Sequence, residues 1–127
     1  MQKLTILVVD DEQDIQDLLS AIIVREFNYE VYTAGSVAEA IKISNKIKVD
    51  VAVLDIKLGD GLGFDIMSHL KSLNDKTAYI FVSAFSQCLE QHEKLKLDSM
   101  GFIGKPFRSK EIIDLLLETS QKIQQNA

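Results

Sequence analysis

The chain has 127 residues, of which 46% are hydrophobic and 26% charged, as is typical of a globular domain. Acidic residues outnumber basic ones by 19 to 14, and the net charge of −5 argues against a general nucleic-acid-binding surface. No apolar run approaches the ~20 residues that would span a bilayer, and the one cysteine, Cys88, cannot form an internal disulfide. We therefore expect one domain over residues 1–127 in the reducing cytoplasm, with no signal peptide and no membrane or nucleic-acid partner.

Five short apolar runs, rich in Val and Ile, alternate with helical patterns along the chain. Runs without polar alternation are typical of strands that are buried on both faces, as in a parallel sheet. Strands that alternate with helices predict an α/β fold, in which helices cover both faces of the sheet. The predicted strands lie near Thr5–Val9, Tyr29–Ala34, Val49–Leu54, Ala78–Ser83 and Gly101–Gly104.

The pattern between the first two strands predicts an amphipathic helix. Apolar residues recur there at positions i, i+3, i+4, i+7 and i+8, which places them on one face of a helix. Asp11, Glu12 and Asp14 stand near its start, where the helix dipole favours negative charge. The predicted buried face consists of Ile15, Leu18, Leu19, Ile22 and Ile23.

The second and third helical patterns follow Ser36 and Gly63. The run from Ser36 to Glu39 is typical of a capping box, in which the two side chains satisfy backbone amides at the helix start. Asn74 and Asp75 mark the turn after the third helix. The second helix is expected to bury Val37, Ala40, Ile41 and Ser44, and the third Phe64, Met67 and Leu70.

The last two helical patterns differ in strength. The fourth is weak, with Cys88, His92 and Leu95 on one face. The fifth, after Pro106, carries an apolar stripe that is wider than contact with one sheet needs. Two interpretations stay open for this stripe: a deeply buried helix, or a partly exposed patch that binds a partner. The stripe consists of Ile112, Ile113, Leu115, Leu116 and Leu117.

Polar side chains stand at the ends of four predicted strands. Asp10 and Asp11 follow the first strand, Asp55 follows the third, Ser83 closes the fourth, and Lys105 follows the fifth. In an open parallel sheet, ligands bind at the carboxyl ends of the strands, so these residues should converge. If the first and third strands are neighbours, three carboxylates crowd together and repel one another unless a cation compensates.

A hard divalent cation suits such a cluster. Mg²⁺ takes oxygen ligands, commonly one or two carboxylates together with a phosphate, and Lys105 would add a positive point charge. For Asp55 alone, a solvated acid at a strand end would be the simpler interpretation. The complete set favours a site, and the sequence therefore predicts Mg²⁺ as the cofactor.

These motifs resemble those of the receiver domain of two-component response regulators, and the resemblance extends from roughly Leu4 to Leu117. It implies a flavodoxin-like (CheY-like) α/β fold, a doubly wound parallel sheet of five strands in the order 2-1-3-4-5 with five helices. Each short motif is weak alone, but four in register are strong. The matching stretches are Ile6–Glu12, Val53–Ile56, Phe81–Ala84 and Phe102–Phe107.

The resemblance assigns roles to the residues of the acidic cluster. It implies that Asp55 is the phosphoacceptor, that Asp11 ligates Mg²⁺ directly, and that Asp10 does so largely through water. The backbone carbonyl of Lys57 would be a further metal ligand. Mg²⁺ and Lys105 would together neutralise the charge of the transferring phosphoryl group.

The resemblance also implies a conformational switch. The Ser83 hydroxyl would turn toward the phosphoryl group, and Phe102 would turn inward behind it. The peptide bond between Lys105 and Pro106 is usually cis in the family. The sequence departs from the family pattern at Gly59, where a proline is common, and the neighbouring glycines would make this loop more pliable. Two further departures are Asp98, where a glycine is common, and Phe102, which lacks the hydroxyl of the commoner tyrosine.

The implied function is that of a phosphoacceptor in a two-component phosphorelay. A sensor histidine kinase or a histidine phosphotransfer domain would donate a phosphoryl group to Asp55. Phosphorylation would then switch a surface on the fourth helix, fifth strand and fifth helix toward an unknown downstream protein or output domain, or toward a second copy in a homodimer. The chain would catalyse only its own phosphorylation and dephosphorylation, so we do not expect an enzyme that turns over a metabolite.

Two other functions are weighed against this one. A pseudo-receiver would act as a binding module without phosphorylation, but the chain retains Asp10, Asp11, Asp55, Ser83 and Lys105. A phosphatase or phosphotransferase with an aspartyl intermediate usually carries a second acid two residues beyond the nucleophile. Lys57 occupies that position here, which disfavours such an enzyme.

Overall fold

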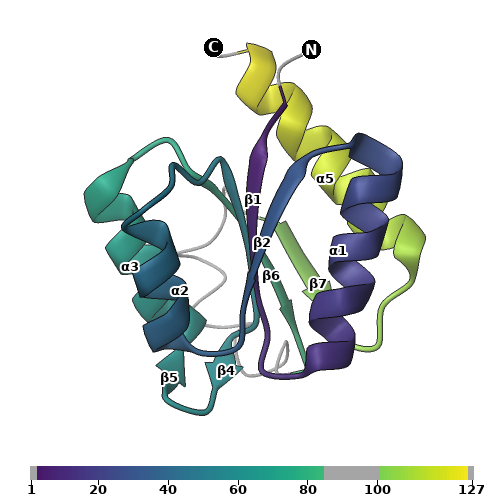
Figure 1. The fold of residues 1–127 in the computed structure, drawn as a ribbon. Coiled ribbons are helices and arrows are strands. Elements are labelled where there is room, and N and C mark those ends of the chain that lie inside the picture. Colours follow the sequence, from purple (N-terminus) through teal and green to yellow (C-terminus); the bar gives the residue numbers. More distant parts are fainter. Residues whose placement is uncertain (1–2, 85–100, 126–127) are drawn as a thin grey trace.

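In a computed structural model, which describes residues 3–84 and 101–125, the chain folds around a five-stranded sheet. The sheet consists of β1 (Thr5–Val9), β2 (Glu30–Ala34), β3 (Val51–Leu54), β6 (Ala78–Ser83) and β7 (Gly101–Gly104). The strands lie in the order β2-β1-β3-β6-β7, and every neighbouring pair is parallel (Figure 1). The predicted order 2-1-3-4-5 is confirmed, because the two short strands β4 (Lys57–Leu58) and β5 (Gly61–Leu62) form a separate antiparallel pair and only shift the numbering.

Helices cover both faces of the sheet, as an α/β fold requires. Figure 1 shows α2 (Val37–Ser44) and α3 (Gly63–Leu73) on one side, and α1 (Gln13–Phe27) and α5 (Ser109–Gln125) on the other. The fourth predicted helix, which contains Cys88, His92 and Leu95, lies outside the described residues, as does Asp98. Across residues 3–84 and 101–125, no helix is long and apolar enough to span a bilayer.

The three central strands, β1, β3 and β6, are buried on both faces, which is why their sequences lack polar alternation. In β1, Ile6 and Val8 face the cluster under α1 and α5, whereas Leu7 and Val9 face the cluster under α2 and α3. All four side chains are at most 1% exposed. The predicted strand positions are therefore confirmed, although β2 and β3 begin one and two residues later than expected.

Of the five residues predicted for the inner face of α1, three are buried, Ile15 is partly buried against the same cluster, and one is wrong. Leu19, Ile22 and Ile23 are buried, but Leu18 is 44% exposed. Gln16 is buried instead, and its Nε2 donates a hydrogen bond to the carbonyl oxygen of Asp10 at 2.7 Å. The buried face of α1 is therefore rotated toward Gln16. The start of the helix must donate a hydrogen bond to the backbone just after β1 as well as cover the sheet.

The starts of α2 and α3 are defined by side-chain hydrogen bonds. Ser36 Oγ accepts the amide of Glu39 at 3.1 Å, which confirms the predicted cap of α2. The Glu39 carboxylate accepts the amide of Gly35 at 3.2 Å, whereas in a capping box it would accept the amide of Ser36. In α3, Ile66 is fully buried, whereas Phe64 and Met67, predicted to face inward, are only partly buried.

Both interpretations of the apolar stripe of α5, a buried helix and a partly exposed patch, hold in part. Ile112 and Leu116 are fully buried against the sheet, and Ser120 continues the same face. Ile113 and Leu115 are partly buried, and the side chain of Leu117 is 42% exposed. The inner half of the stripe is therefore core, and its outer edge reaches the surface.

We expect the phenol of Tyr79, in β6, to resist ionisation. Burial raises its pKa from 10.0 to about 12, and its hydroxyl donates to the carbonyl of Met67 at 3.4 Å. Because the folded-state pKa is raised, this contribution to stability is complete below pH 10 and is lost as the pH rises toward about 12. In a spectrophotometric titration, Tyr79→Phe should remove the tyrosinate component that ionises last. Removal of the earliest component instead would contradict this assignment.

Candidate functional site

The three acidic residues singled out in the sequence converge at the carboxyl edge of the sheet. β1 and β3 are neighbours, and Asp55 donates its amide to the carbonyl of Val9 at 2.9 Å. One carboxylate oxygen from each of Asp10, Asp11 and Asp55 lies within 4.8 Å of the others. Asp10 and Asp55 are buried, while Asp11 is exposed to solvent. The predicted convergence is confirmed, and the cluster is open on the side of Asp11.

Lys105 reaches this cluster from the end of β7. Its amide donates to the carbonyl of Ser83 at 3.1 Å, which places it beyond the end of the neighbouring strand β6. Its Nζ lies 2.7 Å from Asp10 Oδ2 and 3.2 Å from Asp55 Oδ2, and its side chain is 15% exposed. The peptide bond to Pro106 is cis, as the resemblance implied. Lys105 therefore bridges the two buried carboxylates.

The charges in the site are strongly coupled. Burial raises the pKa of Asp10 above its usual 3.8, and the charge of Asp55 adds to this, against the opposing hydrogen bonds from Lys105 and the amide of Glu12. Burial alone would lower the pKa of Lys105, but its hydrogen bond to Asp10 and the charge of Asp55 raise it overall. Lys105 is therefore held as an ammonium, yet three carboxylates still outnumber it.

Two residues near the cluster were missed by the sequence analysis as parts of the site. Glu12, expected only to favour the helix start, places its Oε2 3.6 Å from Lys105 Nζ. Gln16 holds the carbonyl of Asp10, as described above. A signal existed for Gln16: it is a polar residue at helical spacing from Leu19 and Ile23 on the buried face of α1.

The segment after Asp55 is more regular than its glycines suggested. Lys57 pairs with Leu62 across the β4–β5 hairpin, and the amide of Gly63 donates to the carbonyl of Ile56 at 2.7 Å. None of the described glycines adopts a positive φ. Gly63 is required for another reason: a Cβ there would lie 2.3 Å from the carbonyl oxygen of Asp55. The expected loop is thus a paired hairpin held close to the acidic cluster.

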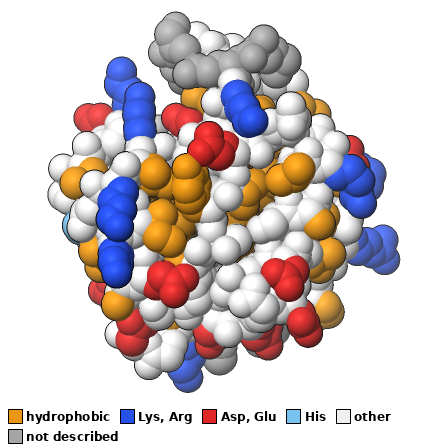
Figure 2. Space-filling model, viewed as in Figure 1, with side chains coloured by type: hydrophobic (Ala, Val, Ile, Leu, Met, Phe, Trp, Pro, Cys, Tyr) orange, Lys and Arg blue, Asp and Glu red, His pale blue; other side chains and the backbone are white. Residues whose placement is uncertain are grey.

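The residues implied for the switch lie on the two strands next to the cluster. Ser83 ends β6 and is fully buried. Phe102, in β7, is in register with Phe81 and is partly buried against the apolar cluster under α2 and α3. Figure 2 shows acidic side chains concentrated on the lower half of the molecule, the end at which Figure 1 places the carboxyl ends of the strands.

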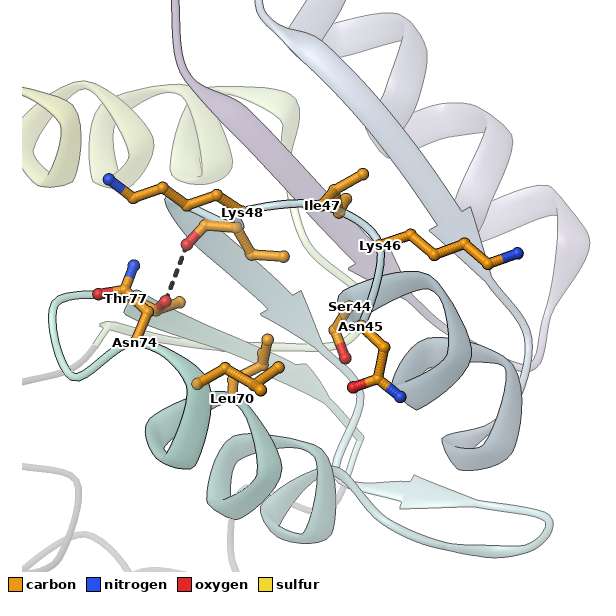
Figure 3. Close-up of a pocket in the computed structure, with 10 residues that line it drawn as sticks. Ser44, Asn45, Lys46, Ile47, Lys48, Leu70, Asn74 and Thr77 are labelled. Carbon is orange, nitrogen blue, oxygen red and sulfur yellow. Dashed lines mark hydrogen bonds between the residues drawn. The ribbon is translucent and has the colours of Figure 1, made fainter.

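A cleft of about 310 Å³ lies near the opposite end of the sheet, between the segments that precede β3 and β6. Figure 3 shows Lys46 and Lys48 pointing away from each other rather than into it. Two of its hydroxyls are occupied by the backbone: Thr77 donates to Val49 at 2.8 Å, and Ser44 donates to Ile41 at 2.9 Å. The cleft gathers no reactive groups, so the acidic cluster is the candidate site.

Comparison with known proteins places the chain in a family. Residues 6–117 match the family model of the response regulator receiver domain. The chain belongs to this family. Receiver domains among the solved structures include a CheY-like protein from Methanospirillum hungatei JF-1, with a TM-score of 0.89 at 23% identity over 99% of this chain and 100% of that one. Another is TrrA from Thermotoga maritima, solved in complex with Mg²⁺ and BeF, with a TM-score of 0.79 at 26% identity over 93% and 99%.

Curated relatives of this receiver include regulatory proteins of Bacillus and Staphylococcus species. The sensory transduction protein LytT of Bacillus anthracis is 34% identical over 114 residues, which cover 89% of this chain and 46% of that protein. The response regulator SaeR of Staphylococcus aureus (strain USA300) is 32% identical over 108 residues, 85% of this chain and 46% of that protein. The chain thus spans about half the length of these relatives.

Proposed function

We propose that this receiver accepts a phosphoryl group on Asp55, with Mg²⁺ held by the acidic cluster and Lys105 beside it. The observation that carries the proposal is the meeting of three carboxylates and one bridging ammonium at the carboxyl edge of the sheet. Of the two buried carboxylates that Lys105 contacts, Asp55 is the one that begins the hairpin segment, and its position in the sequence matches the phosphoacceptor of the family. It is therefore the acid best placed to be phosphorylated.

The chemistry of the cluster fits a magnesium ion. The donors are carboxylate oxygens, one from each of Asp10, Asp11 and Asp55, and the open side at Asp11 leaves room for water ligands. Burial and, after it, the charge of Asp55 raise the pKa of Asp10, so a further cation would favour its ionised form. The carbonyl of Lys57 would complete the protein ligands. When bound, Mg²⁺ supplies charge neutralisation for the phosphoryl oxygens and an oriented template.

The transfer needs only positioning and charge from the protein. An Asp55 carboxylate oxygen attacks the phosphorus of an acyl phosphate or a phosphohistidine. A P–O bond forms, the bond from phosphorus to the donor oxygen or nitrogen breaks, and the leaving group departs with its electron pair. Lys105 Nζ, 3.2 Å from Asp55 Oδ2, is placed to bind a phosphoryl oxygen. No base is needed, because an ionised carboxylate is already a nucleophile.

The same proposal covers partners and signalling. A histidine kinase or histidine phosphotransfer protein would supply the phosphoryl group. Ser83 and Phe102 would rearrange around it and alter the surface near β7 and α5, which a downstream protein or a second copy would then bind. The complete, convergent set of site residues supports this function over the pseudo-receiver alternative. Phosphorylation and dephosphorylation of its own Asp55 would be the only chemistry that the domain performs.

Mass spectrometry after incubation with acetyl phosphate and Mg²⁺ tests the proposal directly. The wild-type chain should gain one phosphoryl group, and Asp55→Asn should gain none because the nucleophile is removed. Asp114→Asn, at an exposed carboxylate on α5, is the matched control and should behave as wild type. Chelation of Mg²⁺ should prevent the modification. An unmodified wild type, or an Asp55→Asn variant modified to the same extent, would refute the proposal.

A further inference from the structure

The hairpin that follows Asp55 has few supports of its own. β4 and β5 pair over two residues each, Lys57 with Leu62 and Leu58 with Gly61. An isolated hairpin of two strands is at best marginally stable in water. Within this one, Leu58 is the only buried residue, whereas Lys57 and Leu62 are exposed. Contacts outside the hairpin must therefore determine where it lies.

Asp60, at the tip of the hairpin, supplies such a contact to α2. Its two carboxylate oxygens accept the amides of Val37 at 2.8 Å and Ala38 at 3.0 Å, the first two residues of the helix. Hydrogen bonds to an ionised acceptor are about twice as strong as neutral ones, and negative charge is favoured at a helix start. These two bonds hold the pKa of Asp60 below its usual value of 3.8. The hairpin tip is thus fastened to α2 by two charge-assisted bonds.

The base of the same hairpin is joined to the acidic cluster. Lys57, whose carbonyl is the further metal ligand in the proposed function, stands two residues after Asp55. The Gly63 amide closes the base by donating to Ile56 at 2.7 Å. Gly63 also lies against the Asp55 carbonyl so closely that an added Cβ would lie 2.3 Å from it. Movement of the hairpin would therefore move the backbone beside the phosphoacceptor.

We propose that Asp60 is a positioning residue for the metal site: by fastening the hairpin to α2, it fixes the backbone of Asp55 and Lys57 in the geometry that binds Mg²⁺. This inference rests on the proposed function. Asp60 touches neither the metal nor the phosphoryl group and acts only through the hairpin backbone. Ser36 offers a matched control, because it caps the same helix through the Glu39 amide at 3.1 Å, a bond that does not involve the hairpin.

Calorimetric titration of the full chain with MgCl₂ tests the proposal in Asp60→Ala, Asp60→Asn and Ser36→Ala. Asp60→Ala should weaken Mg²⁺ binding by about tenfold, the lower end of the loss seen for outer-shell partners of metal ligands. Ser36→Ala should leave the affinity unchanged, although both variants lose a helix cap and should unfold at lower temperature. Asp60→Asn keeps one of the two acceptor oxygens but loses the charge, so its affinity should lie between those of wild type and Asp60→Ala. Hydrogen exchange at the Val37 and Ala38 amides should accelerate in Asp60→Ala.

Two results would overturn the inference. Asp60→Ala could bind Mg²⁺ as tightly as wild type, in which case the anchor has no part in the site. Ser36→Ala could lose as much affinity as Asp60→Ala, which would assign the effect to the stability of α2. Failure of the proposed function is distinct, because the wild type itself would then bind no Mg²⁺ or gain no phosphoryl group on Asp55.

Discussion

Replacing Lys105 with alanine should destabilise the metal-free protein and abolish rapid phosphoryl uptake. The Nζ of Lys105 lies 2.7 Å from Asp10 and 3.2 Å from Asp55, both buried, so its loss leaves two carboxylates without their cation. Breaking a buried ion pair costs roughly 3–5 kcal/mol, and we expect about 2 kcal/mol here because the site opens to solvent at Asp11. Urea unfolding in the presence of a chelator measures the change.

The effect of Lys105→Ala should depend on pH and on metal. Burial and Asp55 hold the pKa of Asp10 above 3.8, so the ionised form is penalised in the folded state and stability falls as the pH rises through that raised pKa. The deficit of the variant should therefore shrink on acidification, when Asp10 is protonated. Added Mg²⁺ should also recover stability, since a ligand that binds the folded state stabilises it by mass action.

A matched control for this variant is Lys110→Ala. Lys110 forms an ion pair with Asp114 at 2.6 Å, but its side chain is 82% exposed, and exposed pairs contribute little. Its removal should not shift the urea midpoint measurably. If Lys105→Ala and Lys110→Ala unfold at the same urea concentration, Lys105 does not compensate the buried acids, and the electrostatic description of the site is wrong.

Local patterns in the sequence were sufficient to predict the sheet and the convergence of the site. Runs such as Ile6–Val9 and Val51–Leu54 are apolar without alternation because both of their faces are covered, and the acids that follow them mark where the strands end. Once parallel strands are placed side by side, the residues after them must meet at one edge. That inference depends only on strand direction and order, so errors of one or two residues at strand ends did not affect it.

The features that could not be predicted depend on contacts between elements. The carboxylate of Asp60 accepts hydrogen bonds from two amides of α2 that lie 22 and 23 residues earlier in the chain. No local sequence pattern predicts these bonds. Leu18 is exposed and Gln16 is buried, because a side chain at the start of α1 must donate a hydrogen bond to the carbonyl of Asp10. Helical periodicity identifies an apolar face, but the neighbours of the helix decide its exact rotation.

Substitution of Gly63 by alanine should impair both stability and phosphoryl uptake. The added Cβ would lie 2.3 Å from the carbonyl oxygen of Asp55, and contacts below 3.0 Å essentially never occur for a real Cβ. The partner is backbone, so either α3 or the strand end that carries Asp55 must move. Overpacking of this kind costs about 1–3 kcal/mol, which exceeds the gain of up to about 1 kcal/mol that alanine offers over glycine in a helix.

Gly59→Ala provides the comparison, because an added Cβ there meets no atom within 4 Å. Both variants replace a glycine in the same segment, so they share the loss of chain entropy in the unfolded state. Gly63→Ala should unfold at lower urea and take up phosphoryl groups from acetyl phosphate more slowly, even under conditions where it is fully folded. Gly59→Ala should take up phosphoryl groups as wild type does and should be at least as stable, because no clash offsets the entropy effect. Equal behaviour of the two variants would show that Asp55 does not depend on the close approach of Gly63, and that the hairpin base leaves the phosphoacceptor free to move.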